Sequence, residues 1–85
     1  MKIVFHKTFL KQFRKLHQNI KIKFYGRLEI FEINKFNPVL NNHSLHYPYE
    51  GCQSINVTGN IRALYEISNN TAIFIRIGSH SELYK

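Results

Sequence analysis

The sequence predicts a small α+β domain with an N-terminal strand, an antiparallel helix hairpin, a three-stranded antiparallel meander and a short C-terminal helical turn. Two patterns carry this prediction. Apolar residues recur at helical spacing between residues 7 and 36. Three β-rich runs between residues 52 and 77 are separated by turn compositions. A chain of 85 residues has room for one domain, which we expect to span residues 1–85.

The N-terminal part predicts one strand and two helices. The run "KIVFH" (2–6) is short and β-rich. Thr8 can cap a helix over residues 7–18, and a second helix is expected over residues 19–36. Because only a residue or two near Gln18–Asn19 would separate them, the helices should form an antiparallel hairpin. The apolar stripes predict these core positions: Phe9, Phe13, Leu16, Ile20, Phe24, Leu28 and Phe31.

Residues 37–51 contain both prolines and form the one long irregular stretch that we expect, a kind of loop that is often functional. The meander follows as "CQSINV", "IRALYEI" and "TAIFIRI". A three-residue turn at 58–60 would pair apolar with apolar residues, whereas a one-residue slip would exchange the two faces. With a second three-residue turn at 69–71, the expected pairs are Ile55–Ala63, Asn56–Arg62, Ile67–Ile73, Tyr65–Ile75 and Ala63–Ile77.

These registers predict an apolar sheet face under the helices and a polar face opposite it. The apolar face would hold Ile55, Val57, Ile61, Ala63, Tyr65, Ile67, Ile73, Ile75 and Ile77. The polar face would hold Ser54, Asn56, Arg62, Leu64, Glu66, Phe74 and Arg76. After Gly78 a serine can cap one turn of helix, and such a turn would put His80 and Tyr84 on one side because they are four residues apart.

Composition favours a cytoplasmic protein and leaves two explanations open for its basic charge. The first 35 residues hold nine basic and two acidic side chains, so they carry the whole net charge of +7. Such a field favours nucleic acid or an acidic protein, although a solvated lysine face used for solubility explains the charge equally well. The single cysteine, Cys52, fits a reducing compartment and is expected to be structural. No run resembles a signal peptide or a membrane span.

The polar face, the 37–51 loop and the C-terminal residues together offer two arginines, three histidines and a tyrosine: Arg62, Arg76, His43, His46, His80 and Tyr84. Arginines bind phosphate, histidines transfer protons near neutral pH, and tyrosine can stack on a base. These groups suffice for metal-free RNA cleavage, in which a base activates the ribose 2′-OH and an acid protonates the leaving oxygen. A zinc site is disfavoured, since the histidines lack ligand spacing. The sequence has no P-loop, GxGxxG or nucleophile elbow.

Each of these residues also has a plain structural interpretation. Either arginine could form a surface ion pair with a glutamate. His43 could cap a loop, His46 could close a turn, and His80 could be a solvated turn residue. Tyr84 could pack over the sheet edge. The residue types by themselves do not decide between these structural interpretations and the functional ones.

The order of elements resembles the RelE/ParE toxin superfamily, and most strongly its YafQ-like branch of ribosome-dependent mRNA interferases. The resemblance covers the whole chain and depends on "FNPVLNNHSLH", "YEGCQSINVTGNIRALYEI" and "IFIRIGSHSELYK". It implies a RelE-like microbial RNase fold and the toxin of a type II toxin–antitoxin system. Such a toxin cuts mRNA in the ribosomal A site, beside 16S rRNA, and is neutralised in a hetero-oligomer with a cognate acidic antitoxin. It implies no cofactor.

The resemblance also implies residue roles. His43 matches a loop histidine implicated in catalysis, His80 the general acid, Tyr84 a substrate contact and Arg62 an arginine on the scissile phosphate. Asn60, which stands where the family usually has an aspartate, is expected among the catalytic residues with these four. We also expect RNA contacts from Arg76, Asn56 and His46. As a separate hypothesis from their charge, the basic residues of the two helices contact ribosomal RNA or the acidic segment of the antitoxin: Lys11, Arg14, Lys15, Lys21 and Lys23.

Two departures keep alternatives open. Asn60 removes a carboxylate, and Gln53 removes a cation that is frequent at its position. A catalytically weakened toxin that binds antitoxin or ribosome therefore remains an alternative. Another is a ParE-like toxin that binds a protein target such as gyrase, although ParE-like members generally lack the two histidines in "NNHSLH" and "GSHSELY".

Overall fold

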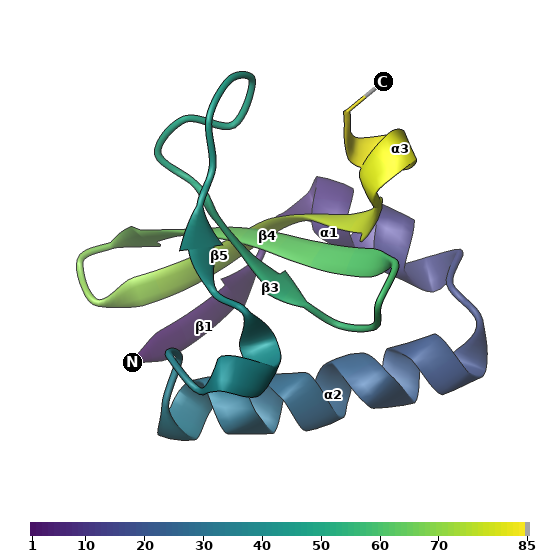
Figure 1. The fold of residues 1–85 in the computed structure, drawn as a ribbon, viewed down its shortest axis with the longest axis horizontal. Coiled ribbons are helices and arrows are strands. Elements are labelled where there is room, and N and C mark those ends of the chain that lie inside the picture. Colours follow the sequence, from purple (N-terminus) through teal and green to yellow (C-terminus); the bar gives the residue numbers. More distant parts are fainter. Residues whose placement is uncertain (85) are drawn as a thin grey trace.

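The computed structural model of the chain describes residues 1–84 and consists of one mixed five-stranded sheet with helices packed around it (Figure 1). The strand order is β1-β5-β4-β3-β2, with β1 parallel to β5 and the other neighbours antiparallel. The elements are β1 (Lys2–Phe5), α1 (Lys7–Arg14), α2 (Gln18–Ile33), the 3₁₀ turn η1 (Pro38–Leu40), β2 (His43–Ser44), β3 (Gln53–Asn56), β4 (Ile61–Ser68), β5 (Thr71–Ser79) and α3 (His80–Leu83).

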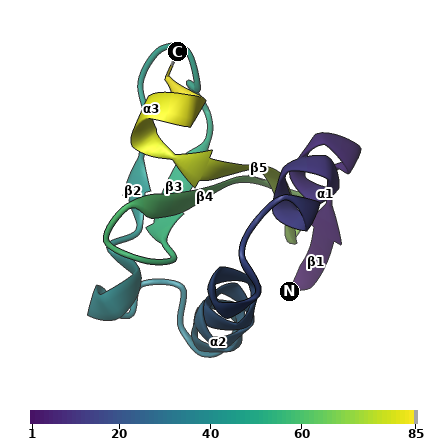
Figure 2. The same ribbon diagram turned by 90° about the vertical axis from the view of Figure 1, so that its right-hand side faces the viewer.

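The sheet separates two layers (Figure 2). The long helix α2 lies under one face, with α1 beside the β1–β5 edge. The loop between β2 and β3 and the short helix α3 project from the opposite side. No helix within residues 1–84 is both long enough and apolar enough to span a membrane.

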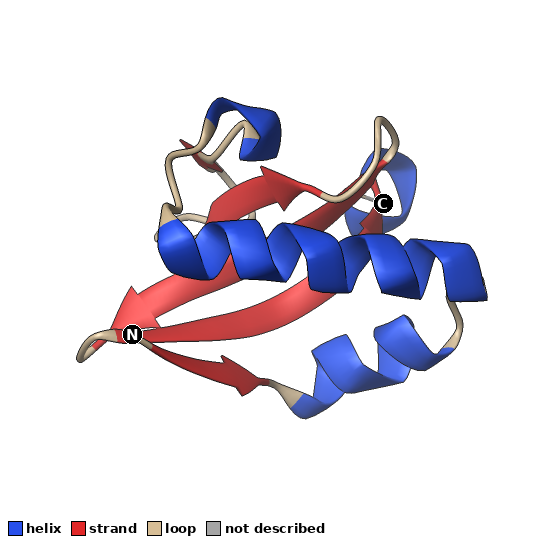
Figure 3. Cartoon of the chain, turned by 90° about the horizontal axis from the view of Figure 1, so that it is seen from below, coloured by secondary structure: helices blue, strands red, loops and turns tan. Residues whose placement is uncertain are grey.

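The helix hairpin is present, with shorter helices than predicted (Figure 3). The Nδ1 atom of His6, not Thr8, caps α1 by accepting the Thr8 N–H at 3.1 Å. The break falls at residues 15–17 instead of Gln18–Asn19, because Lys15 and the next residue bond three residues back and tighten the last turn. The second helix ends at Ile33 rather than at residue 36.

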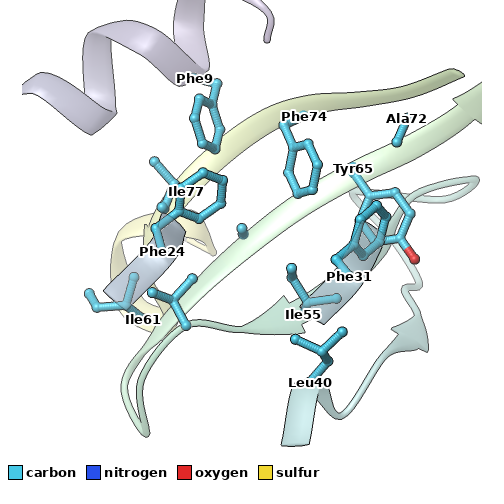
Figure 4. Close-up of a cluster of buried hydrophobic side chains, with 12 residues drawn as sticks. Phe9, Phe24, Phe31, Leu40, Ile55, Ile61, Tyr65, Ala72, Phe74 and Ile77 are labelled. Atoms are coloured by element: carbon cyan, nitrogen blue, oxygen red, sulfur yellow. The ribbon is translucent and has the colours of Figure 1, made fainter. Parts of the chain in front are cut away.

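Aromatic rings form the core between the helices and the sheet (Figure 4). Phe9, Phe24 and Phe31 from the helices meet Tyr65 and Phe74 from β4 and β5, with centroid separations of 4.9 to 5.9 Å among the contacting pairs. The predicted helical stripe is therefore confirmed as core. Its other members are partly buried and pack against this cluster: Phe13, Leu16, Ile20 and Leu28.

The predicted register is correct for the first turn of the meander and wrong for the second. Ile55 pairs with Ala63, and Asn56 with Arg62, as expected. The second turn has two residues, Asn69 and Asn70, both with positive φ. Asparagine tolerates this conformation, and a two-residue turn of this kind matches the twist of a hairpin. The observed pairs beyond it are Ser68–Thr71, Ile67–Ala72, Glu66–Ile73 and Tyr65–Phe74, in place of Ile67–Ile73 and Tyr65–Ile75.

A register shift between Leu64 and Tyr65 then restores the predicted pairing of Ala63 with Ile77. The extra residue on the β5 side is Ile75, as expected for a β-bulge. Phe74 consequently points into the aromatic core, where it is fully buried, and not onto the polar face. The two isoleucines that were predicted for the core, Ile73 and Ile75, are only partly buried and lie outside it.

Residues 37–51 are more ordered than an irregular loop. The Asn37 side chain accepts the Val39 N–H at 3.0 Å and starts η1, which ends where Asn41 adopts a left-handed conformation. The chain then forms β2 at the sheet edge, with His43 opposite Ser54. The three-stranded meander is thus the centre of a five-stranded sheet, and β2 brings the loop histidine into register with it.

Candidate functional site

A row of four residues crosses the sheet on the side away from α2. Direct cross-strand pairing joins His43 to Ser54, Ser54 to Leu64, and Leu64 to Arg76. Directly opposed residues point to the same face of a sheet. Since the neighbouring Ala63 belongs to the core, this row faces away from the helices. Three strand spacings place the backbones of His43 and Arg76 about 14 Å apart.

The two middle side chains of this row are buried, whereas the two at its ends are accessible to solvent. Ser54 and Leu64 are 2% and 1% exposed, whereas His43 is exposed and Arg76 is half-buried. The Arg76 guanidinium donates through Nη1 to the Ile75 carbonyl at 2.8 Å. Its other N–H groups can bind an anion above the sheet.

A second row lies next to the first and contains Asn56, Arg62 and Gly78. Arg62 donates through Nη1 to the carbonyls of Thr58 and Gly59, both at 3.1 Å. The β3–β4 turn therefore fixes the guanidinium at the edge of the polar face. Beside it, the Oδ1 atom of Asn56 is buried and accepts no hydrogen bond among the described residues.

The helix α3 continues directly from the second row. Ser79 and Glu82 form a capping box: Ser79 Oγ accepts the Glu82 N–H at 3.2 Å, and Glu82 Oε1 accepts the Ser79 N–H at 2.8 Å. A Cβ atom on Gly78 would lie 3.2 Å from Glu82 Oε1. The absence of a side chain at Gly78 therefore leaves room for the Glu82 carboxylate. The predicted serine cap is confirmed.

The rings of His80 and Tyr84 stack on one side of α3, as their spacing predicted. Their centroids are 4.6 Å apart and the planes are inclined by 30°. Burial, with smaller contributions from Tyr49 and Cys52, raises the pKa of the Tyr84 phenol above its usual value of about 10. Tyr84 is therefore a neutral hydroxyl at physiological pH, able to stack or donate.

Tyr49 completes the site and was not among the predicted residues. It lies in the β2–β3 loop, and its hydroxyl donates to the Leu83 carbonyl at 2.7 Å. Its ring meets that of Tyr84 edge to face, with centroids 5.4 Å apart. The sequence signal was weak, because an aromatic residue after a proline is a common loop composition.

His43 has a defined tautomer. Its Nδ1 atom lies 2.7 Å from the Asn41 carbonyl oxygen. A carbonyl only accepts hydrogen bonds, so Nδ1 carries the proton and Nε2 of the neutral ring is the acceptor. This arrangement suits a general base.

The remaining candidates lie further from the two rows. Asn60 is exposed in the β3–β4 turn, where its N–H donates to Thr58 Oγ1 at 3.2 Å. His46 is exposed at the start of the tight turn that presents Tyr49. Cys52 is buried beneath the loop, and burial, with a smaller effect of Glu66, raises the pKa of its thiol against the lowering effect of Arg76. The thiol stays protonated, which fits a structural residue.

The chain is similar in structure to several solved toxins. The chain superposes on YafQ from E. coli strain BL21(DE3) with a TM-score of 0.75 and 20% identity, covering 99% of this chain and 98% of that chain. It superposes on the YoeB/ParE toxin from Agrobacterium tumefaciens with a TM-score of 0.78 and 16% identity, over 94% and 99% of the two chains. The chain has the RelE/YafQ-type toxin fold.

Two further structures with the RelE/YafQ-type fold come from complexes. One is the RelB–RelE antitoxin–toxin complex from Methanococcus jannaschii, with a TM-score of 0.75, 23% identity, and coverage of 96% and 95%. The other is the E. coli DinJ–YafQ complex, with a TM-score of 0.73, 21% identity, and coverage of 99% and 98%. A scan of protein-family models and a search of curated proteins gave no match.

In this RelE/YafQ-type fold the predicted basic residues lie on α1, at its C-cap and on α2. Lys11 and Arg14, with Lys7 and Thr8, line a hollow of about 450 Å³ on α1. Lys15 lines a separate pocket of about 310 Å³, between α1 and the end of β5, with Gln12, Leu16, Ile77, Gly78 and Glu82.

The two lysines on α2 belong to the layer opposite α3 (Figure 2). Lys21 lies 5.9 Å from the centroid of the Phe13 ring, and Lys23 is exposed. Helical periodicity did not show that α1 lies beside the C-terminal end of β5 while α2 lies under the sheet. Among residues 1–84, no group of three or more metal-ligating side chains is placed to hold a metal ion.

Proposed function

We propose that this protein is the toxin of a type II toxin–antitoxin system and that it cleaves mRNA on the ribosome. One observation carries the proposal. Cross-strand pairing aligns His43 with Arg76, sets Arg62 and Asn56 in the adjacent row, and leads directly into the helix that bears His80. This arrangement of two histidines and two arginines, with three on one face of the sheet and His80 on the helix that follows, supports the proposal. The fold shared with YafQ and RelE supports the same function.

The chemistry that suits this face is attack of the ribose 2′-OH on the adjacent phosphate. His43 accepts the 2′-OH proton at Nε2, since Nδ1 is held by the Asn41 carbonyl. His80 donates a proton to the leaving 5′-oxygen. Arg62 and Arg76 stabilise the charge that develops on the phosphate, and no metal ion is required.

The other residues bind and orient the RNA. Tyr84 stacks on a base with its neutral ring. The partly buried Asn56 side chain, which lies next to Arg62 in the second row, binds a ribose hydroxyl or a base. Asn60 and His46 contact the strand from the two turns that border the face. A ribosomal target places the protein in the cytoplasm.

The partners follow from charge and fold. The hollow that Lys7, Lys11 and Arg14 line on α1 binds 16S rRNA or the acidic segment of a cognate antitoxin. Antitoxin complexes of YafQ and RelE are the basis for expecting such a partner here. A toxin–antitoxin hetero-oligomer is the expected resting form.

The test is cleavage of a defined mRNA in a cell-free translation system, mapped by primer extension. The wild-type protein should produce cuts with codon periodicity. Replacing His80→Ala should slow cleavage by about 10²–10⁴-fold, the usual contribution of a general acid. The control is His17→Ala, because His17 is exposed at the start of α2 and its side chain makes no capping hydrogen bond.

Three other outcomes would contradict the proposal. Uncut mRNA together with stalled replication in cells would indicate a toxin that binds a protein target such as gyrase. Uncut mRNA together with detectable binding of the wild-type protein to ribosomes or to an antitoxin would indicate a catalytically inactive binder. Equal loss of cleavage in His80→Ala and His17→Ala would show a general effect on folding.

A further inference from the structure

The β2–β3 loop and α3 project from the same side of the sheet and contact each other there. The contact has two parts, both made by Tyr49. Its hydroxyl donates to the Leu83 carbonyl at 2.7 Å, and its ring meets the Tyr84 ring edge to face at 5.4 Å. Residues 34 positions apart in the chain are thereby joined at the site.

α3 needs such support because it has only four residues. A single helical turn is unstable on its own, and its last carbonyl groups lack partners within the helix. The capping box satisfies the N-terminal end. At the other end the Leu83 side chain is buried and its carbonyl accepts the Tyr49 hydroxyl. Tyr49 therefore supplies a hydrogen bond to the C-terminal end of α3.

Tyr49 is itself held firmly. Its N–H donates to the His46 carbonyl at 2.9 Å, and its carbonyl accepts the Cys52 N–H at 3.0 Å. Backbone hydrogen bonds to residues before and after Tyr49 thus fix its backbone within the loop, and with it the position of the phenol. Tyr47, two residues earlier, is 83% exposed.

From these contacts we propose that Tyr49 is a positioning residue, which holds α3 so that His80 and Tyr84 stay stacked over the polar face. The line of contact runs from the Tyr49 ring to Tyr84, and from Tyr84 to His80 at 4.6 Å. Tyr49 does not touch the reacting atoms. This inference rests on the proposed RNA cleavage only for its catalytic consequence, since the holding of α3 is a property of the fold.

The first experiment tests the holding of α3 without any substrate. Tyr49→Phe removes the hydroxyl and keeps the ring, and Tyr47→Phe is the matched control in the same loop. Loss of one neutral hydrogen bond should speed exchange of the Tyr84 amide, which bonds to the His80 carbonyl at 3.0 Å, by about fivefold. The NMR signals of the His80 ring protons should shift as the Tyr84 ring moves. Unchanged exchange and unchanged signals in Tyr49→Phe would overturn the proposal.

The second experiment tests the catalytic consequence. In single-turnover cleavage on ribosomes, Tyr49→Phe should lower the rate by about fivefold and leave the affinity for the ribosome–mRNA complex unchanged. Tyr47→Phe should leave both quantities unchanged. An equal loss in rate for both variants, or a loss of affinity alone in Tyr49→Phe, would contradict a positioning role.

The two experiments separate this inference from the proposed function. A wild-type protein that never cuts mRNA, combined with faster Tyr84 exchange in Tyr49→Phe, would refute the proposed function and the catalytic role while confirming that Tyr49 holds α3. A wild-type protein that cuts, with a Tyr49→Phe variant that cuts and exchanges equally well, would refute the role of Tyr49 alone.

Discussion

At the scale of single residues, the site depends on hydrogen bonds that fix side chains before any ligand binds. The Asn41 carbonyl sets the tautomer of His43, and the β3–β4 turn carbonyls hold Arg62. Groups held in this way lose little freedom when they bind a substrate. Residue types at these positions were predictable from the sequence. Their fixed orientations were not, because they depend on backbone carbonyls whose directions only the folded chain defines.

Tyr65 shows how a buried phenol couples stability to pH. It is fully buried on the core side of β4, and burial raises its pKa, with a smaller opposing effect of Asn42. A raised pKa in the folded state means that the contribution to stability is complete below the unfolded value of about 10. The contribution is lost as pH rises through the folded value.

Tyr65→Phe should therefore lose less free energy of unfolding between pH 8 and pH 11 than the wild type does. Urea unfolding at both pH values measures the difference, and lysine deprotonation affects all variants alike. Tyr47→Phe, at an 83% exposed position, should behave as the wild type. If Tyr65→Phe and wild type lose the same free energy over this interval, the explanation is wrong.

At the scale of elements, the sequence indicated the helices, the meander and the C-terminal turn, whereas the second register was wrong. The error lay at Asn69–Asn70, where two left-handed asparagines make a tighter turn than expected. The bulge at Leu64/Tyr65 then corrects the pairing toward the end of β5. Arg76 consequently lies on the predicted face. Phe74, which was predicted for the polar face, lies in the core instead. A bulge has no reliable signal in alternating apolar residues, since it changes the alternation itself.

The short strand β2 was also missed, because two residues give no periodicity. Its position matters for the site, since it pairs His43 with Ser54 and so joins the loop histidine to the arginine row. The resemblance to a known family predicted this histidine. Only the sheet order showed that it shares a face with Arg76.

The basic surface of α1 makes a separate prediction about binding. Lys11→Ala combined with Arg14→Ala removes two charges from the hollow on α1, and Lys2→Ala combined with Lys35→Ala removes two charges elsewhere. If α1 contacts ribosomal RNA, the first pair should reduce the slope of log affinity against log salt by about 1.5, and the second should leave it unchanged. Sedimentation with ribosomes over a salt series gives both slopes. Equal reductions would mean that the charge acts through the whole molecule instead of through α1.

At the scale of the whole molecule, the helices and the candidate site use opposite sides of one sheet. Aromatic residues from α1, α2, β4 and β5 fill the side toward the helices, while the β2–β3 loop and α3 meet on the other. The side with the loop and α3 has a small buried floor of Ser54, Leu64, Cys52 and Leu83. The aromatic core and the candidate site thus lie on different faces of the sheet, so changes to exposed residues of the candidate site should leave the fold intact.

This separation allows the account's central claim, that His43 and His80 act together in one cleavage reaction, to be tested directly. The measurement is the single-turnover rate of mRNA cleavage on ribosomes for wild type, His43→Ala, His80→Ala and the double variant. We expect each single change to lower the rate by about 10²–10⁴-fold, and the double variant to be no slower than about the slower single variant, because residues that act as a unit are not additive. A double variant whose loss in rate is the product of the two single losses, or no cleavage by the wild type, would contradict the account.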